Sequence, residues 1–182
     1  LSSLETRANS CLAKMEIWFN VNKLSLNVEK TSYTLFSHRM KNSIDSSLNL
    51  FINKQLINKV KSYKYLGVFI DSALQWDDHI DYLYKKLIKF TSIFYKMRDI
   101  LPRACLYKLY YSFVHPHLLY GIEVYANASK SSLDRLLKLN NKLLRILFNK
   151  DFSTPINELY VSLNILPIPI LHEMQLLVLI HK

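Results

Sequence analysis

The pattern of hydrophobic positions divides the chain into a mixed first part and a helical second part. Residues 4–19 place their apolar side chains three or four positions apart, which predicts an amphipathic helix. Residues 31–37, 48–52 and 55–60 are short runs typical of strands, and the last two would form a hairpin. The polar residues 39–47 predict a loop.

The most strand-like run covers residues 63–70 and ends at Asp71-Ser72. It contains Gly67, one of only two glycines in the chain. Glycine inside a strand weakens it, so this glycine indicates a bulge or a second backbone passing close by. One helix with several short antiparallel strands predicts an α+β arrangement for residues 1–75.

From Asp77 onward the apolar positions follow the helical period, so residues 76–182 are predicted to be mainly α-helical. Asp77, Asp78 and Asp81 fall at the start of the first long helix, where the helix dipole favours acids. The later helices are predicted to begin near Pro102, Ser131, Pro155 and Pro169.

Composition and charge narrow the class of partner. Half of the 182 residues are hydrophobic, which is enough for a buried core. Residues 1–75 hold 10 basic and 5 acidic side chains and residues 76–182 hold 14 and 9, so each part carries +5 of the net +10. This spread favours an anionic partner, with nucleic acid ahead of a membrane surface. The apolar residues 165–182 are interrupted by polar ones and fall short of a membrane span.

The cysteines and the chain ends bear on location and completeness. Cys11 and Cys105 are too few for a disulfide framework, and no signal peptide is visible. We therefore expect an intracellular protein of the nucleus or cytoplasm that is not secreted. The chain opens at Leu1 rather than at a methionine and stops within a helical pattern, so we expect both ends to be internal to a longer protein.

Few residues suggest chemistry by themselves. Asp77-Asp78 could hold metal ions, but a carboxylate pair for two Mg²⁺ needs extended runs on both sides, and a helix N-terminus is favoured here. His115 and His117 flank a proline without further ligands, which favours packing over metal binding. We predict no metal site. The lysines of the helix after Asp77 either contact phosphates or form a solvated face.

Three stretches, residues 18–36, 63–80 and 110–125, together resemble the reverse transcriptases of non-LTR retrotransposons, especially the jockey-like type. The first contains Asn27-Val-Glu-Lys30-Thr31, the second Tyr65-Leu66-Gly67, and the third His115-Pro116-His117. The resemblance implies that residues 1–75 form the C-terminal part of a polymerase palm with a primer-grip-like strand. Residues 76–182 would form the helical thumb and the start of the following region. The implied activity is RNA-directed DNA synthesis.

The same resemblance implies roles for particular residues. Lys30 would lie near the incoming nucleotide, as a general acid toward pyrophosphate or as a phosphate contact. Tyr65, Leu66 and Gly67 would form the primer grip, which positions the 3′ end of the primer. An RNA–DNA primer–template is the implied partner, and its phosphates would be contacted by basic helix residues, namely Lys85, Lys89, Lys96, Lys138 and Lys142.

One departure from the family pattern affects the expected activity. The metal-binding aspartates of the family should lie before Leu1, so we expect Mg²⁺ to be held by the full-length parent and no cofactor by this chain. The missing N-terminal polymerase half would then be a second partner, and the chain alone would be inactive. Two alternatives stay open: a non-enzymatic helical interaction module, and a decayed element copy without its own activity.

Overall fold

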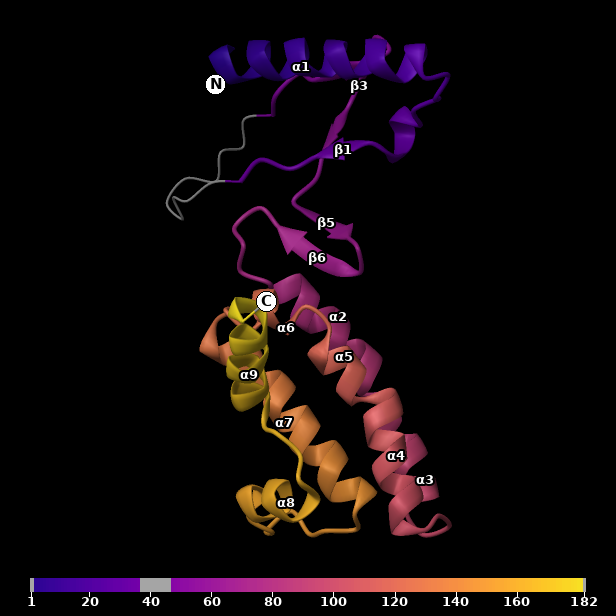
Figure 1. Ribbon diagram of the computed structural model, residues 1–182, viewed down its shortest axis with the longest axis vertical. Helices are drawn as coiled ribbons and strands as arrows, with labels where there is room; N and C mark the ends of the chain where they lie inside the picture. Colours follow the sequence, from indigo (N-terminus) through magenta and orange to yellow (C-terminus); the bar gives the residue numbers. More distant parts are fainter. Residues whose placement is uncertain (1, 37–46, 182) are drawn as a thin grey trace. The chain divides into compact units, whose positions relative to one another are not determined.

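A computed structural model describes residues 2–36 and 47–181, which divide into two compact units (Figure 1). The first unit comprises Leu1–Tyr65 and Ile70–Leu74, and the second comprises Leu66–Phe69 and Gln75–Lys182. The loop predicted for residues 39–47 lies outside the described residues, except for its last position. Helix and strand occur together, which agrees with the predicted α+β class.

The first unit combines one long helix with very short strands. Its elements are α1 (Ser2–Val21), the 3-10 turn η1 (Val28–Lys30), β1 (Ser32–Tyr33), β2 (Phe51–Ile52), β3 (Gln55–Leu56) and β4 (Asn58–Lys59). β2 and β3 pair in an antiparallel hairpin, as predicted. β4 then pairs with β1 in parallel, whereas the sequence predicts only antiparallel strands. The prediction is wrong there because the hairpin around Asn53-Lys54 pairs only two residues of each strand. The chain then continues past β3 and pairs Asn58 and Lys59 with Ser32 and Tyr33 of β1 in the same direction.

A small hydrophobic cluster holds the first unit together. Its buried members are Leu48, Leu50, Ile52 and Ile57, and α1 adds only half-buried residues to it. The side chain of Asn9 fixes α1 to the neighbouring extended segment. Its amide donates to the carbonyl of Asn49 at 2.9 Å, and its oxygen accepts from the backbone N–H of Phe51 at 3.0 Å. A helix side chain therefore satisfies backbone groups that a strand neighbour would otherwise bind.

Residues 62–71 form a hairpin rather than the single strand predicted for residues 63–70. β5 (Ser62–Tyr65) and β6 (Val68–Asp71) make a two-stranded sheet, joined by Leu66-Gly67. Both turn residues have positive φ, 46° and 90°, as a type I′ turn requires. Gly67 therefore lies in the turn between two strands instead of within one strand, and glycine suits this place because it adopts positive φ without a steric penalty.

The second unit is helical. Its helices are α2 (Asp77–Leu87), α3 (Phe90–Met97), α4 (Arg103–Phe113), α5 (His115–Leu119), α6 (Ile122–Tyr125), α7 (Lys130–Leu147), α8 (Ile156–Leu163) and α9 (Ile168–Ile180). The long helix predicted after Asp77 is interrupted at Ile88-Lys89, although both residues keep right-handed helical angles. α7 begins at a cap on Ser129, whose side chain accepts from the N–H of Ser132, so the cap lies two residues before the predicted one.

The core of the second unit lies around α7, which packs against α2 and α3 (Figure 1). The fully buried side chains of α7 include Leu136, Leu143, Leu144 and Leu147. Among the described residues, no single helix is long and apolar enough to cross a membrane, while α8 and α9 together reach that length and composition with a 45° bend between them.

One polar side chain is completely buried in this core. The oxygen of Asn140 accepts from the hydroxyl of Tyr110 at 3.2 Å, and its amide group lies 3.1 Å from the hydroxyl of Tyr160. The Tyr160 hydroxyl in turn donates to the Asn141 side chain at 2.7 Å. Burial raises the pKa of both tyrosines. The network joins α4, α7 and α8 and satisfies groups that would be costly to bury alone.

Candidate nucleic-acid interface

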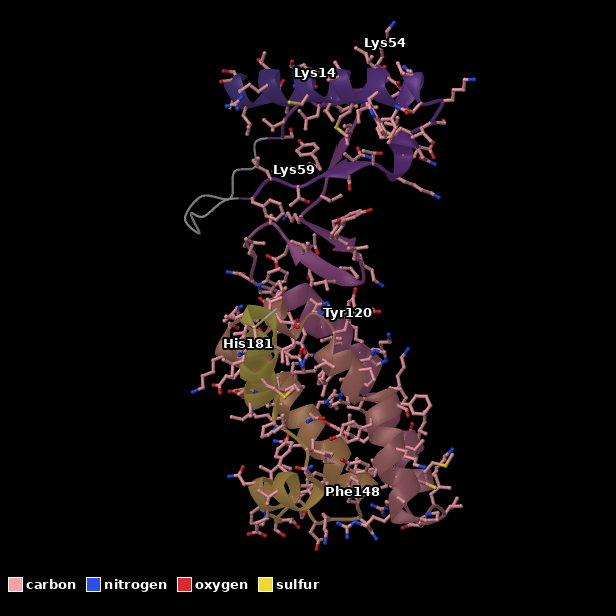
Figure 2. All side chains as sticks on the ribbon, in the orientation of Figure 1. Lys14, Lys54, Lys59, Tyr120, Phe148 and His181 are labelled. Atoms are coloured by element: carbon pink, nitrogen blue, oxygen red, sulfur yellow. The ribbon has the colours of Figure 1, made fainter. Side chains whose placement is uncertain are left out.

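The Leu66-Gly67 turn is exposed to solvent, and the hydroxyl of one tyrosine binds its backbone. Leu66 is 73% exposed and Tyr65, at the end of β5, is 59% exposed. Tyr120 lies at the end of α5 and is labelled in Figure 2. Its hydroxyl donates a hydrogen bond to the carbonyl of Leu66. A residue 54 positions away in the sequence thus fixes the backbone at the tip of the hairpin.

The two glycines of the chain meet on either side of this contact. A Cβ atom on Gly67 would lie 3.2 Å from the ring of Tyr120, and one on Gly121 would lie 3.1 Å from the Val68 side chain. Both glycines also have positive φ. The absence of a side chain at Gly67 therefore lets Tyr120 approach closely, and its absence at Gly121 does the same for Val68. A larger residue at either glycine would push the turn away from the α5–α6 segment.

A buried histidine fixes the first residues of β6. The backbone N–H of Phe69 donates to Nδ1 of His79 at 3.4 Å, a long hydrogen bond. The His79 ring lies 5.0 Å from the ring of Tyr125, whose hydroxyl donates to the carbonyl of Leu118. The turn therefore rests on α2, α5 and α6 through aromatic packing as well as through Tyr120.

Lys30 lies in the first unit, at the end of η1, and its side chain is exposed. The Asn27 side chain caps this turn by accepting from the backbone N–H of Lys30 at 3.1 Å. The hydroxyl of Thr31 donates to the carbonyl of Asn27 at 2.8 Å. The spacing Asn27-x-x-Lys30-Thr31 therefore has a local structural reason: it closes a turn that presents the lysine. Its role toward a nucleotide stays a prediction.

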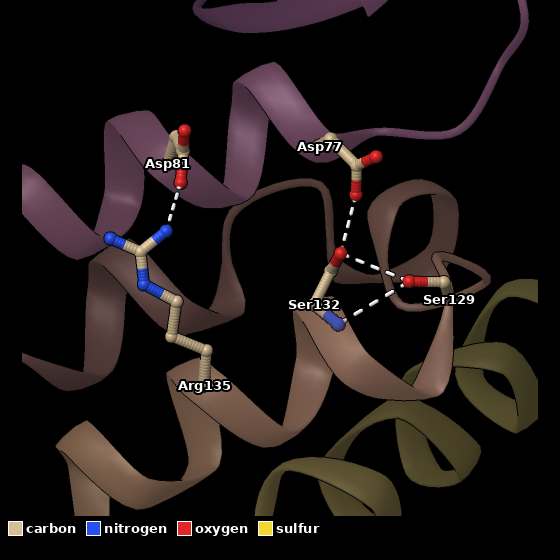
Figure 3. A network of polar contacts seen from close by, with 5 residues as sticks. All are labelled: Asp77, Asp81, Ser129, Ser132 and Arg135. Carbon is tan, nitrogen blue, oxygen red and sulfur yellow. Dashed lines mark hydrogen bonds and ion pairs between the residues drawn. The ribbon is translucent and has the colours of Figure 1, made fainter.

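The acids at the start of α2 hold α7 in place (Figure 3). Asp77 accepts a hydrogen bond from the Ser132 hydroxyl, and Asp81 forms an ion pair with Arg135. The Arg135 guanidinium also lies 4.1 Å from the ring centre of Tyr84. The Asp77 carboxylate thus binds a hydroxyl and the Asp81 carboxylate binds a guanidinium. These partners fit the interpretation of the acids as charges at a helix N-terminus better than that of a metal site.

The same contacts show the direction of the two helices. Ser132 and Arg135 follow one another along α7 in the order of Asp77 and Asp81 along α2, so the helices run side by side in the same direction. Lys85 and Lys89 continue the row of Asp81 at intervals of four. Lys138 and Lys142 continue the row of Arg135 on α7. We call these four exposed lysines the lysine stripe.

Four of the five predicted phosphate contacts are therefore exposed lysines on α2, just after α2, or on α7. Lys96 is exposed on α3, seven residues beyond Lys89. Lys86 is not part of the stripe, because its ammonium lies 5.7 Å from the ring centre of Tyr82. The pKa of His117 is lowered mainly by burial and, to a smaller extent, by the positive charge of Lys86. Whether the stripe contacts phosphates remains a prediction.

The two histidines around Pro116 pack within the helices. The His115 ring lies 4.8 Å from that of Tyr111, and burial lowers the pKa of His115. Three or more His, Cys, Asp or Glu side chains that could hold a metal ion do not come together anywhere in residues 2–36 and 47–181.

Sequence reasoning missed the support of the turn. It assigned no role to Tyr120, Gly121 or His79, although the Tyr120 hydroxyl donates to the Leu66 carbonyl. One signal was present: in a chain with two glycines, both lie next to apolar or aromatic residues typical of packing. The sequence does not reveal that Gly67 contacts Tyr120 and that Gly121 contacts Val68, because 54 residues separate the two glycines.

Comparison with known proteins identifies the sequence class. The chain is 30% identical over 131 residues to an RNA-directed DNA polymerase from the mobile element jockey of Drosophila melanogaster. It is also 30% identical over 125 residues to the corresponding polymerase of Drosophila funebris. The matches cover 70% and 67% of this chain but only 14% and 13% of those relatives. No protein-family model matches, and no solved structure matches significantly. The resemblance to jockey-like reverse transcriptases is confirmed.

Proposed function

We propose that this jockey-like reverse transcriptase chain holds a primer–template duplex, with the Leu66-Gly67 turn at the primer end and the lysine stripe along the phosphates. The observation that carries the proposal is the hydrogen bond from Tyr120 to the Leu66 carbonyl, which fixes an otherwise exposed turn. The relatives are named as RNA-directed DNA polymerases, so their substrates are nucleic acids.

The turn suits contact with a nucleic-acid backbone. Gly67 has no side chain to keep a ligand away, and its ordered neighbours limit the motion of the tip. Positioning of a chain end depends on such rigidity, because a misplacement of about 1 Å is enough to slow a transfer reaction strongly. Tyr120 is therefore a positioning residue: it acts on the primer through Leu66.

The lysine stripe supplies attraction without sequence preference. Four exposed ammonium groups, two on or next to α2 and two on α7, supply positive charge, whereas Arg135 is paired with Asp81. Contacts of this kind release counterions, so affinity should fall steeply with salt. Lys30, in the first unit, would add a phosphate contact at the incoming nucleotide.

The boundary between palm and thumb is part of the proposal. The division into two units between residues 65 and 75 supports a palm portion in residues 1–75 and a thumb in residues 76–182. The described residues bring together no metal-holding group, so we propose that this chain alone binds nucleic acid without extending a primer, and that Mg²⁺ acts only in a longer polymerase.

The test is binding of the chain to a labelled RNA–DNA duplex by fluorescence anisotropy at several salt concentrations. Replacing Lys85 and Lys89 together by alanine should lower the affinity and reduce the salt slope by about 2, roughly one for each lysine removed. The matched control replaces Lys14 and Lys54, two exposed lysines of the first unit (Figure 2), and should leave both unchanged. Equal losses of affinity in the two double variants would refute the role of the stripe.

A second candidate function is a helical interaction module without enzymatic activity. The last helix favours it: α9 exposes several large apolar side chains, namely Leu177, Val178, Leu179 and Ile180. An apolar patch of this kind is typical of protein association. Size-exclusion chromatography at two protein concentrations distinguishes this function, because an interaction module would shift toward larger species at the higher concentration and a nucleic-acid binder would remain a monomer until duplex is added.

A further inference from the structure

A surface pocket in the second unit combines cationic and aromatic side chains that are not part of the lysine stripe. Its volume is 540 Å³, within the range of roughly 300–1,000 Å³ typical of ligand sites. Its walls come from the first turns of α4, the end of α7 and the end of α8, and its lining residues are Arg103, Ala104, Tyr107, Lys108, Phe148, Ser162 and Leu163.

The charged side chains of the pocket are all positive. Arg103 and Lys108 are exposed, and neither forms an ion pair with a carboxylate of the described chain. No Asp or Glu belongs to the lining. The Arg103 guanidinium lies 6.0 Å from the ring centre of Phe148, which Figure 2 labels at the end of α7. The pocket therefore attracts anions and carries a flat cation held near an aromatic ring.

The aromatic wall is fixed by its neighbours. Tyr107 lies one turn after Arg103 on α4, so both side chains share a helix face. The Tyr107 ring centre is 4.7 Å from that of Tyr111, and the Tyr111 hydroxyl donates to the carbonyl of Asn164 at 3.4 Å, a weak hydrogen bond. α4 is thus joined to the end of α8 next to Tyr107, which limits the motion of the Tyr107 ring.

We propose that this pocket binds an unpaired nucleotide of a single-stranded nucleic acid. The base stacks on Tyr107 and the Arg103 guanidinium, and its phosphate contacts Lys108. An aromatic ring beside a guanidinium recognises the flat face of any base, and that face is accessible only when the base is unpaired. The pocket lining contains none of the lysines of the lysine stripe, so the pocket is a second, separate site. The inference does not depend on the proposed duplex binding.

The test uses the full chain and a fluorescein-labelled 12-nucleotide oligouridylate, with an RNA–DNA duplex as the second probe. Replacing Arg103 and Lys108 together by alanine should weaken single-strand binding by roughly tenfold and change duplex binding by less than about twofold. The Lys85→Ala, Lys89→Ala double variant removes the same charge and should show the reverse pattern. If both variants weakened the binding of both probes equally, the proposal would be overturned, because binding would then depend only on the total positive charge.

Two further measurements address the base. An oligonucleotide of the same length with abasic sites keeps the phosphates and should bind roughly tenfold more weakly than oligouridylate. A 4-thiouridine in the strand should crosslink to the peptide that contains Tyr107. Equal binding of the abasic strand, or crosslinks confined to other peptides, would overturn the site. So would displacement of the strand by free uridine monophosphate at equal nucleotide concentration, because the pocket would then take free nucleotides.

Discussion

The two units differ most in how much apolar surface each of them buries by itself. In the second unit α7 is covered on several sides, and large side chains such as Tyr110, Tyr125 and Phe94 are almost completely buried. In the first unit the buried cluster has four members, the strands β1 to β4 are each two residues long, and α1 has no fully buried residue. Met15, Ile17, Trp18 and Val21 of α1 are exposed.

This difference explains where rigidity comes from. A strand of two residues makes few ladder hydrogen bonds, and isolated two-stranded sheets are marginally stable in water. The second unit owes its order to the packing of α7 against α2 and α3. We infer that the part carrying the turn and the lysine stripe is stable by itself, whereas the part carrying Lys30 gains stability from additional contacts.

The largest effect is expected from the same substitution in the two cores. Leu143→Ala in α7 removes a side chain without solvent exposure and should cost about 2–5 kcal/mol of unfolding free energy. Leu50→Ala in the first unit should cost less, because its half-buried neighbours can relax into the space. Urea unfolding measures the cost, and hydrogen exchange shows which segment loses protection. Loss of protection throughout the chain in both variants would mean a single cooperative unit.

High pH should destabilise the second unit. Burial raises the pKa values of Tyr110, Tyr125 and Tyr160 above the ordinary value of 10.0, so the folded state keeps protons that the unfolded state loses. Their contribution is complete below pH 10 and is lost as the pH rises above it. For Tyr110 and Tyr125 the loss is on the order of 1 kcal/mol each at one pH unit above. Urea midpoints at pH 9 and 11 measure the loss. The Tyr110→Phe variant should lose less stability between pH 9 and pH 11 than the original chain. An equal shift of the urea midpoint in both proteins would contradict the explanation.

A smaller effect is expected at the turn. Tyr120→Phe removes the hydroxyl that donates to Leu66 and should cost about 0.5–1.5 kcal/mol. Hydrogen exchange should accelerate in residues 66–69 and remain unchanged in α7, while duplex affinity falls. Tyr95→Phe, at a similarly exposed tyrosine of α3, is the control and should change neither. If Tyr120→Phe weakens duplex binding without affecting the turn, the positioning role is wrong.

The smallest effect is expected at the ion pair between α2 and α7. Both side chains are about half exposed, so solvent screens their attraction and Asp81→Asn should cost between about 0 and 1 kcal/mol. A double-mutant cycle with Arg135→Ala isolates the coupling. A coupling well above 1 kcal/mol would show that this surface contact, and not only the apolar core of α7, holds the second unit together.

The sequence by itself determined the local features of this protein. The helical period predicted α1 and the helices after Asp77, and the prolines gave the starts of α4, α8 and α9 to within two residues. The motifs around Lys30, Gly67 and His115 identified the jockey-like class that the relatives confirm. These features depend on residues within one or two turns of each other, so a linear pattern contains them.

Only the tertiary structure decided how distant residues meet. The pairing of β1 with β4, the contact of Tyr120 with the Gly67 turn and the parallel course of α2 and α7 join segments 26 to 55 residues apart. The pocket of Arg103 and Tyr107 likewise needs the ends of α7 and α8. Such contacts depend on chain reversals and on which apolar faces pack together, and a local pattern does not contain that choice because several packings satisfy the same periodicity.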